Sequence, residues 1–384
     1  MKPTVNYALK TLFILGFVGM LMLPLFLTRM GLEDALKGGL VARVDASTRV
    51  PFTPLALRRQ ITAVDDWRRK FSSMFWGRSW LLEQVALLKL ERTQSSRWRE
   101  DALRGELPWL YLAGNETNDT IDNWRGTFQY SETELDRICV VVRAWQDWSE
   151  ARGMEFLMVV PPNKVSIYPE YMPDWLTPFD GPTSTSRLIT RLREAGVNLL
   201  DLKPVLEPEK ANHLLYYRTD THWNQLGAFF CARAILGSDA FAKFGMGSPE
   251  LTEYRIEWEE GEGGDLSRPI EFAPQLAEPR AILTRITGIT SEYVWPNRHY
   301  HQLIRQTNEH AAPNAPRLFT VNDSFLHAPE RFLYRNCREL LSWWTADYQF
   351  PVDVILEEQP DILVFSVLER FLPYLSELRL PPAP

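Results

Sequence analysis

The chain has 384 residues, 45% of them hydrophobic and 24% charged, so it can bury one large core or two smaller ones. Its 42 Lys and Arg residues against 49 Asp and Glu residues give a formal net charge of -7, which argues against a nucleic acid as partner. The three cysteines, Cys139, Cys231 and Cys337, are widely spaced and form no CxxC pair. This pattern indicates small buried hydrophobic side chains, not a metal site or a disulfide scaffold.

An apolar run of membrane-spanning length lies near the N-terminus. It extends from Thr11 to Thr28, follows Lys2 and Lys10, and is long enough to cross a hydrocarbon layer of about 30 Å. The residues after Leu27 offer no small-x-small cleavage site, so we expect an uncleaved signal-anchor, with removal of the segment as the alternative. Lysines on the short N-terminal side place that side in the cytoplasm and the rest of the chain outside it.

The chain divides into three expected parts. Residues 1–29 form a cytoplasmic tip and transmembrane anchor, and residues 30–106 form a helical membrane-proximal stalk with interleaved charges. Residues 107–384 form one compact domain, which contains an inserted irregular region at about 240–315.

Short apolar strands alternate with amphipathic helices along the compact domain. Strands are predicted at 155–160, 197–202, 318–321 and 362–367, with a further candidate at 214–217. Helices are predicted from the capping box of Ser131 and Glu134 to Gly153, and at 186–195, 224–235, 325–344 and 352–358. This alternation is typical of an α/β fold in which helices cover both faces of a parallel sheet.

Two polar segments about a hundred residues apart hold the parts of an activated nucleophile. In the segment 218–224, Asp220 and His222 are two residues apart, so an extended backbone points both side chains to one face. In the segment 320–325, Ser324 stands where a buried apolar run gives way to a predicted helix. Together they suggest Ser324 as the nucleophile, His222 as its base and Asp220 as the group that orients the imidazole.

Each segment alone also has an ordinary explanation, since a serine at a helix start is commonly an N-cap and an Asp-x-His pair is commonly a surface feature. Their expected location favours the catalytic interpretation. Ligands of open parallel sheets bind at the carboxyl ends of the strands, and Lys164, Ser324 and Arg370 all follow such ends. The backbone N–H of Phe325, at the predicted helix start, is the expected donor to an oxyanion.

Eight short segments form an ordered set between about residues 67 and 372. They are FWGR at 75–78, PWLYL at 108–112, PPNK at 161–164 with YPE at 168–170, DTHWN at 220–224, GDL at 264–266, DSF at 323–325 and ERFL at 369–372. The set resembles the AlgJ/AlgX group of SGNH hydrolase-like polysaccharide O-acetyltransferases. The anchor and the short chain after residue 372 look more like AlgJ than AlgX.

The resemblance implies an SGNH-like sheet flanked by helices and an acetyl-enzyme mechanism, in which acetate delivered across the inner membrane passes to a sugar hydroxyl. It maps the family's Asp, His and nucleophilic Ser onto Asp220, His222 and Ser324. Two positions depart from the family pattern: Asn322 stands where relatives commonly have a Gly or another small or polar residue, and the Trp109 segment lacks the usual Gly-Lys lead.

We therefore expect a bacterial inner-membrane protein whose periplasmic domain O-acetylates an exopolysaccharide or a related cell-surface glycan. The expected partners are the polysaccharide acceptor and a membrane-bound acyltransferase that supplies acetyl groups, with no cofactor, metal or nucleic acid. Two alternatives stay open. One is an acetyl esterase with the same residues, and the other is a catalytically silent scaffold of a polysaccharide export complex.

Three further residues are predicted to bind the sugar. Lys164 and Arg370 are candidates for an anionic sugar, with ion pairs to acidic residues at the sheet edge as the alternative. Trp223 is a candidate for stacking on a sugar ring, with core packing as the alternative. His327, three residues after Ser324, is a second candidate for the base, although its place one turn along the predicted helix favours an orientation away from the serine.

Overall fold

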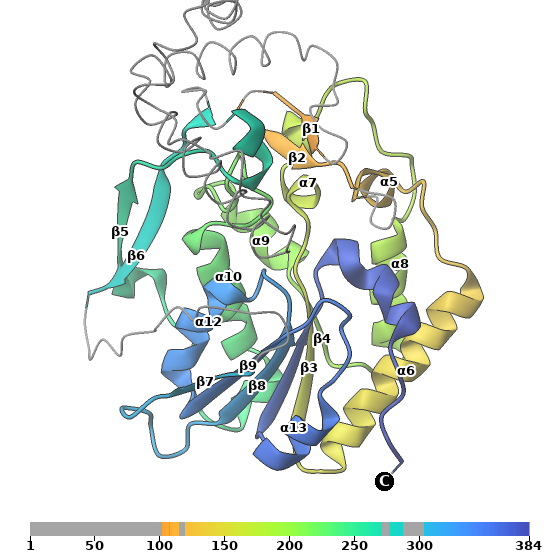
Figure 1. The fold of residues 1–384 in the computed structure, drawn as a ribbon, viewed down its shortest axis with the longest axis vertical. Coiled ribbons are helices and arrows are strands. Elements are labelled where there is room, and N and C mark those ends of the chain that lie inside the picture. The colour runs from red at the N-terminus through yellow and green to blue at the C-terminus, as the bar shows by residue number, and fades with distance from the viewer. Residues whose placement is uncertain (1–101, 107, 115–119, 271–275, 287–302, 384) are drawn as a thin grey trace, which may run out of the picture. The chain divides into compact units, whose positions relative to one another are not determined.

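A six-stranded sheet forms the centre of the molecule (Figure 1). The computed structural model describes residues 102–106, 108–114, 120–270, 276–286 and 303–383. The strand order is β4-β3-β10-β8-β9-β7, in which all neighbours are parallel except the edge strand β7, which runs antiparallel to β9. The bounds are β3 Glu155–Val160, β4 Leu199–Asp201, β7 Leu303–Thr307, β8 Arg317–Asn322, β9 Glu339–Trp344 and β10 Ile362–Ser366.

The central strands are apolar along their whole length because both faces of the sheet are covered. All five residues of β10 are buried, as are five of the six in β3 and in β8. Alternate side chains of β3 enter different cores: Leu157 and Val159 join one, and Phe156 and Met158 join the other. Continuous apolar runs are typical of such doubly covered parallel strands, and the predicted α/β fold is confirmed.

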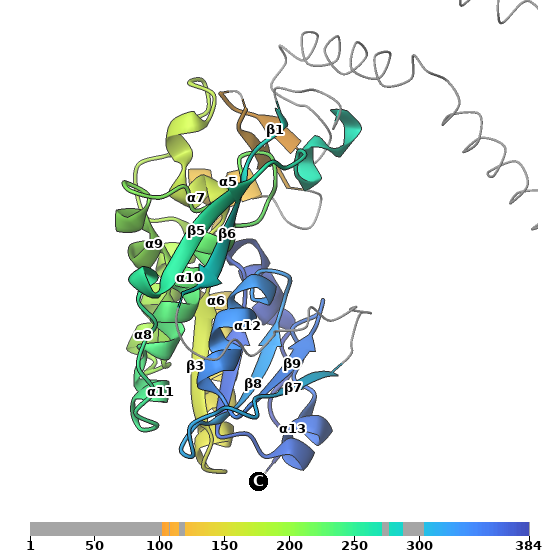
Figure 2. The ribbon, with the colours of Figure 1, turned by 90° about the vertical axis from the view of Figure 1, so that its left-hand side faces the viewer.

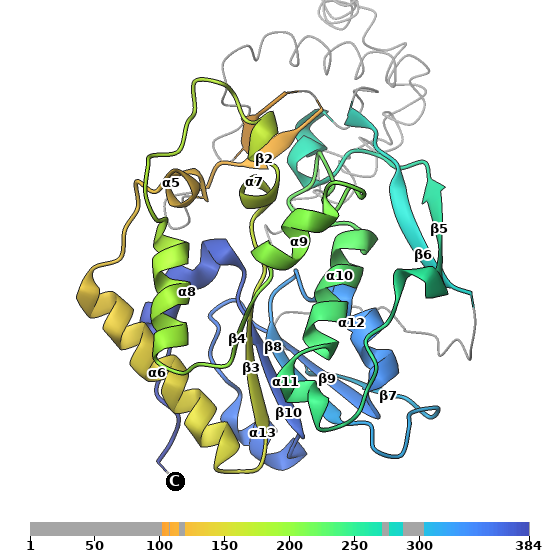
Figure 3. The same ribbon diagram turned by 180° about the vertical axis from the view of Figure 1, so that it is seen from behind.

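Helices cover both faces of the sheet, and Figure 3 shows α10 and α12 on one side of the strands and α6 and α8 on the other. The longer helices are α6 Glu132–Glu150, α8 Ser184–Glu194 and α10 Gln225–Leu236. The shorter ones are α5 Thr120–Arg125, α7 Lys164–Ile167, α9 Lys203–Glu209, α11 Asp239–Ala242, α12 His327–Leu333 and α13 Val352–Glu358. The 3₁₀ turns lie at Pro169–Tyr171, Leu251–Glu253, Asp265–Ile270, Tyr334–Asn336 and Glu369–Glu377.

The predicted helix starts agree with the structure where a capping side chain marks them. Ser131 caps α6, and its capping box with Glu134 is complete. Asn224 caps α10 through its side chain, which accepts hydrogen bonds from the backbone N–H groups of Leu226 and Gly227.

The helix predicted at 325–344 is wrong. Only α12 is helical there, a 3₁₀ turn follows it, and residues 339–344 form β9 between β8 and β7. A short apolar run that is buried on both faces has no period that separates a strand from a buried helix, so the pattern could not distinguish them.

The region expected to be irregular, at about 240–315, holds three strands. β5 Tyr254–Glu259 and β6 Arg280–Arg285 form an antiparallel ribbon, which Figure 2 shows above α10 and apart from the central sheet. β7 closes the central sheet as its edge strand. These strands carry many exposed polar side chains, so they lack the apolar signal by which buried strands are found.

The strand candidate at 214–217 is also wrong, since it makes a single bridge between Tyr216 and Trp223.

The structure describes the last residues of the expected stalk, and they form a strand. β1 Ala102–Arg104 pairs antiparallel with β2 Leu110–Leu112, so the compact domain includes residues before 107. The rest of the expected stalk and the apolar run at 11–28 lie outside the described residues. Within the ranges that the structure describes, no helix is both long enough and apolar enough to span a membrane.

Candidate active site

The serine, histidine and aspartate singled out in the sequence lie in one hydrogen-bonded chain. Ser324 follows the carboxyl end of β8 by two residues, and its Oγ lies 2.9 Å from Nε2 of His222. The other ring nitrogen of His222, Nδ1, lies 2.7 Å from Oδ1 of Asp220, which also accepts the backbone N–H of His222 at 2.9 Å. This is the geometry of a nucleophile, a base and an orienting carboxylate.

The carboxylate of Asp220 is held in its ionised form. Burial by itself would raise its pKa, but the hydrogen bonds from the His222 side chain and from the backbone N–H groups of His222 and Asp265 outweigh burial and lower the pKa well below its usual range. Because the ionised Asp220 accepts a hydrogen bond from Nδ1, it favours the imidazole tautomer of His222 that carries its proton on Nδ1. Nε2 of His222 is then free to accept the proton of Ser324.

The loop at 217–224, which carries Asp220 and His222, lies outside the central sheet and is held by a buried lysine. The ammonium group of Lys164 donates to the backbone carbonyls of Tyr217, Arg218 and Asp220 at 3.2, 2.9 and 2.6 Å. Lys164 is only 4% exposed, and burial lowers its pKa to about 8. The prediction that Lys164 binds sugar is therefore wrong: its three donors already serve the loop.

A second support for this loop comes from the 3₁₀ turn that begins at Asp265. Thr221 donates to the Asp265 carboxylate through its backbone N–H at 2.8 Å and its hydroxyl at 2.7 Å. The backbone N–H of Asp265 donates to Oδ2 of Asp220 at 2.9 Å. Gly264 makes the close approach possible, since a Cβ there would lie 2.3 Å from the Cβ of Asp220. The only sequence signal for this turn is the GDL segment.

A third support is the buried carboxylate of Glu278. It accepts the backbone N–H of Arg218 at 2.6 Å and that of Thr219 at 2.9 Å. Glu278 is 3% exposed and lies 60 residues beyond Arg218. Nothing in the local sequence around Glu278 indicated this role.

On the nucleophile side, Asp323 holds the turn. Its carboxylate accepts the backbone N–H of Phe325 at 2.8 Å, the hydroxyl of Tyr348 at 2.8 Å and the backbone N–H of Leu368 at 3.1 Å. Burial raises the pKa of Asp323 despite these bonds. The prediction that the N–H of Phe325 receives an oxyanion is wrong, because that N–H is already bound and α12 begins only at His327.

Asn322, the departure from the family pattern, points into a buried polar network beneath the turn. Its side-chain amide donates to Thr320 Oγ1 at 2.6 Å, to Ser342 Oγ at 3.0 Å and to Glu330 Oε1 at 3.3 Å. All four of these side chains are buried. Asn322 thus joins the end of β8 to β9 and α12, and among the described residues its side chain makes no hydrogen bond with Ser324.

Trp223 packs in the core, so the prediction that it stacks on a sugar is wrong. It is 2% exposed, and its ring meets the ring of Phe325 edge to face at 5.1 Å between centroids. Phe325 in turn lies 4.9 Å from the imidazole of His222. The ring of Phe325 therefore packs against the imidazole of His222, and the ring of Trp223 packs against Phe325 in turn.

Arg370 is brought close to the site but is largely enclosed. Its guanidinium lies 5.3 Å from the ring centroid of Phe325 and donates to Oδ1 of Asn163 at 3.3 Å. Burial lowers its pKa. The carboxylate of the neighbouring Glu369 accepts hydrogen bonds from the backbone N–H of Asn163 and from the hydroxyl of Ser166. A contact between Arg370 and an anionic sugar remains a prediction.

His327, the second candidate for the base, is not the imidazole that meets Ser324 Oγ; that place is taken by His222.

Asp220, His222 and Asp265 have ligand-type atoms within 4.8 Å of one another, which is close enough for a cation. Those atoms also bond to one another, to Thr221 and to Ser324.

The fold and these side chains define an SGNH-like α/β protein. The chain belongs to the family described as "SGNH hydrolase-like domain, acetyltransferase AlgX", whose model matches residues 103–308. This confirms the family resemblance stated from the sequence motifs.

The individual relatives share about a quarter of the aligned residues with this chain. The probable alginate O-acetylase AlgJ of Pseudomonas aeruginosa is 25% identical over 262 residues, which are 65% of this chain and 67% of that protein. Its namesake from Pseudomonas syringae pathovar tomato is 25% identical over 142 residues, 36% of this chain and 33% of that protein.

Two solved structures can be compared with this chain at low sequence identity. Bacillus cereus PatB1 with a sulfonyl adduct is 14% identical with a TM-score of 0.50, covering 70% of this chain and 93% of that one. The O-acetyltransferase domain of Pseudomonas putida AlgJ is 19% identical with a TM-score of 0.49, covering 72% of this chain and 93% of that one.

Proposed function

We propose that this chain is a polysaccharide O-acetyltransferase that works through an acetyl-serine intermediate at Ser324. The observation that carries the proposal is the continuous hydrogen-bonded chain from Ser324 Oγ through His222 to Asp220 in a member of this family. The relatives named as alginate O-acetylases support a glycan as the acceptor.

In the first half of the reaction, Nε2 of His222 takes the proton of Ser324 while Oγ attacks the carbonyl carbon of an acetyl donor. The bond between the acetyl group and its carrier breaks, and His222 returns the proton to the departing carrier. Asp220 stabilises the imidazolium that forms in between. The product is Ser324 bearing an acetyl ester.

In the second half, a sugar hydroxyl replaces the carrier. His222 takes the proton of that hydroxyl, the sugar oxygen attacks the acetyl carbonyl, and the proton passes to Ser324 Oγ as its ester bond breaks. Water in place of the sugar would give acetate, so the esterase alternative uses the same residues. Positioning of the acceptor decides between the two outcomes.

The test is Ser324→Ala in the full-length chain. Because the acetyl group then has no nucleophile to join, hydrolysis of a small acetyl ester should fall by on the order of 10³-fold or more. Mass spectrometry of the wild-type chain with an acetyl donor should show one added acetyl group, which Ser324→Ala should lack.

The matched control is Ser238→Ala. Ser238 follows α10, and the one hydrogen bond of its hydroxyl to a described residue goes to the carbonyl of Ile235, so turnover should stay near that of the wild type. Activity of Ser324→Ala within a few-fold of wild type would reject the mechanism, whereas a wild-type chain without any activity would favour the scaffold alternative.

We also propose that the catalytic domain lies in the periplasm, held at the inner membrane by the N-terminal apolar run and supplied with acetyl groups by a membrane-bound acyltransferase. The orientation in the membrane is inferred from Lys2 and Lys10, which precede that run. A reporter active only outside the cytoplasm should work when fused after Pro384 and fail when fused before Met1. The reverse pattern would overturn this placement.

A further inference from the structure

The three carbonyl groups that Lys164 holds belong to peptide units whose N–H groups are also held by charged side chains. The ammonium of Lys164 donates to the carbonyls of Tyr217, Arg218 and Asp220 at 3.2, 2.9 and 2.6 Å. Each of these carbonyls shares a planar peptide unit with the N–H group of the next residue. Lys164 therefore fixes one side of three peptide units in the loop that carries Asp220.

The opposite side of each of these peptide units is fixed by a carboxylate. Glu278 accepts the N–H of Arg218 at 2.6 Å and that of Thr219 at 2.9 Å, which complete the units of the first two carbonyls. Asp265 accepts the N–H of Thr221 at 2.8 Å, in the same unit as the third carbonyl. All three peptide units thus lie between an ammonium and a carboxylate.

This arrangement couples the buried charges to one another. A charge at each end stabilises the dipole of a peptide unit, and hydrogen bonds in series polarise one another. Lys164 and Glu278 are only 4% and 3% exposed, so water screens their attraction little. A buried charge without a compensating partner is costly, so the removal of either residue leaves the other in an unfavourable state.

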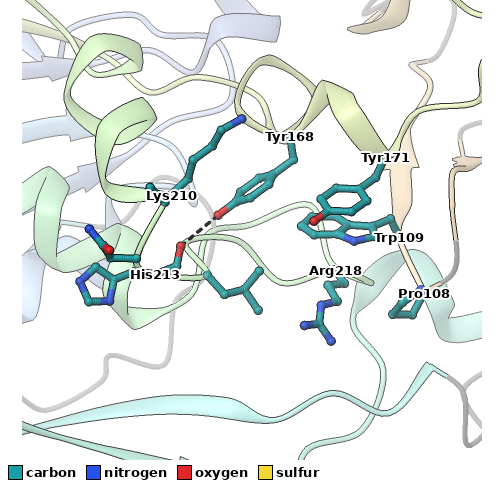
Figure 4. Close-up of a pocket in the computed structure, with 10 residues that line it drawn as sticks. Pro108, Trp109, Tyr168, Tyr171, Lys210, His213 and Arg218 are labelled. Carbon is teal, nitrogen blue, oxygen red and sulfur yellow. Dashed lines mark hydrogen bonds between the residues drawn. The ribbon is translucent and has the colours of Figure 1, made fainter.

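The contacts of Lys164, Glu278 and Asp265 hold the backbone of the loop. Arg218, for example, takes part through its N–H and carbonyl, whereas its side chain lines a pocket of about 570 Å³ beside the loop (Figure 4). The last of the three units begins at Asp220, whose carboxylate lies 2.7 Å from Nδ1 of His222. A shift of these units would therefore move the imidazole that meets Ser324.

We propose that Lys164, Glu278 and Asp265 form a peptide clamp, in which opposite charges act on one another through the peptide units 217–218, 218–219 and 220–221 and so hold His222 in place for Ser324. Lys164 and Glu278 are thus positioning residues that work as one unit. The inference rests on the proposed function, because it takes His222 to be the catalytic base.

A double-mutant cycle in the full-length chain tests the coupling. Lys164→Met should lower kcat for a small acetyl ester by on the order of 10²-fold, with KM within a few-fold of wild type, because the base is displaced while the substrate site remains. Glu278→Gln should lower kcat by about tenfold, and the double variant should be no worse than Lys164→Met. Losses that multiply to about 10³-fold would show two independent supports and overturn the clamp.

The matched control is Lys243→Met, alone and with Glu155→Gln. These two side chains pair directly at 2.7 Å, and Glu155 begins β3, at the end of the sheet opposite to Ser324. The kcat of each control variant should stay within a few-fold of wild type.

The pH profile gives a readout that a purely structural lysine would not move. Burial lowers the pKa of Lys164 to about 8, and the nearby carboxylates oppose burial, Glu278 most strongly. The charged or titratable groups that face Lys164 are the carboxylates of Glu278, Asp220 and Asp265, the ring of Tyr111 at 5.3 Å, and Arg370, which lines the same small cavity.

The kcat of the wild type should fall as pH rises through about 8, because Lys164 then loses the proton that holds the carbonyls. Glu278→Gln should move this fall to lower pH, since the loss of a neighbouring carboxylate lowers the pKa of Lys164. If Lys164→Met does not fold by near-ultraviolet circular dichroism, these two profiles decide. A kcat that stays constant from pH ~7 to ~10 in the folded wild type would overturn the clamp.

Hydrogen exchange separates this inference from the proposed function. Lys164→Met should speed exchange of the N–H groups at 218, 219 and 221, measured by mass spectrometry, whereas Arg218→Gln should not, because the clamp holds only the backbone of Arg218. If exchange is faster in Lys164→Met while Ser324→Ala keeps its activity, the clamp stands and the acetyl-serine mechanism falls. If Ser324→Ala is inactive but exchange in Lys164→Met equals that of the wild type, the clamp is wrong and the function stands.

Discussion

The two halves of the candidate active site are held in place by different means. Ser324 extends from β8, which lies inside the sheet between β10 and β9, and its turn is braced by the buried carboxylate of Asp323. Asp220 and His222 lie on a loop outside the sheet, held by side chains of Lys164, Asp265 and Glu278, among others. The position of the nucleophile thus depends on the core, and the position of the base depends on polar contacts with remote segments.

This difference gives two kinds of expected defect. Changes to Asp220 and His222 should lower turnover while the fold survives, since neither side chain belongs to the buried apolar core. Changes on the nucleophile side should lower the free energy of unfolding, because they remove partners from buried backbone groups.

The largest effect is expected from the base and its carboxylate. His222→Ala and Asp220→Ala should each lower kcat by on the order of 10³-fold, and the double variant should be little worse than His222→Ala, since residues that act as one unit are not additive. Steady-state hydrolysis of a small acetyl ester measures this. A crippling effect of His327→Ala, with His222→Ala nearly active, would mean that the wrong imidazole has been paired with Ser324.

Next in size is Gly264→Ala. The added Cβ would lie 2.3 Å from the Cβ of Asp220 and 2.7 Å from its backbone N and Cα, so the loop must shift. A displacement of this order should lower kcat by about 10²-fold. Gly247→Ala is the matched control, because a Cβ there meets nothing within 4 Å. Full activity of Gly264→Ala would show that the contact with the turn at Asp265 does not position Asp220.

A smaller change in activity, but a larger one in stability, is expected from Asp323→Ala. It would leave the backbone N–H groups of Phe325 and Leu368 buried without their acceptor. The free energy of unfolding should drop by about 2–4 kcal/mol, measured by urea denaturation. If Asp323→Ala keeps the wild-type midpoint, the nucleophile turn is not braced as described.

The smallest effect concerns pH. The folded-state pKa of Asp220 lies below its unfolded value of about 3.9, so its contribution to stability is present above that pH and is lost as pH falls toward the lower folded value. Urea midpoints of the wild type and Asp220→Asn should therefore differ most above pH ~4 and converge in stronger acid. A difference that stays constant across this range would mean that Asp220 is not held ionised by His222.

Elements whose cause lies in neighbouring residues could be predicted from the sequence alone. The apolar runs of β3, β8 and β10 identify buried strands, and Ser131 and Asn224 mark helix starts through their own side chains. It also determined which residues come together as Ser324, His222 and Asp220, because the order of the motifs in the chain resembles that of a known family. These inferences needed only neighbouring residues or a fixed motif order.

The roles of the side chains around those three residues could not be predicted, because they depend on contacts made by the folded chain. Lys164 and Trp223 are not at the surface, because each packs against residues far along the chain. The N–H of Phe325 is not free, because it donates to the carboxylate of Asp323, which Tyr348 and Leu368 hold in place. The supports of the catalytic loop lie 44 residues beyond Thr221 at Asp265 and 60 residues beyond Arg218 at Glu278. Residue type states which hydrogen bonds a side chain can make, whereas the fold determines which partner is within 3 Å of it.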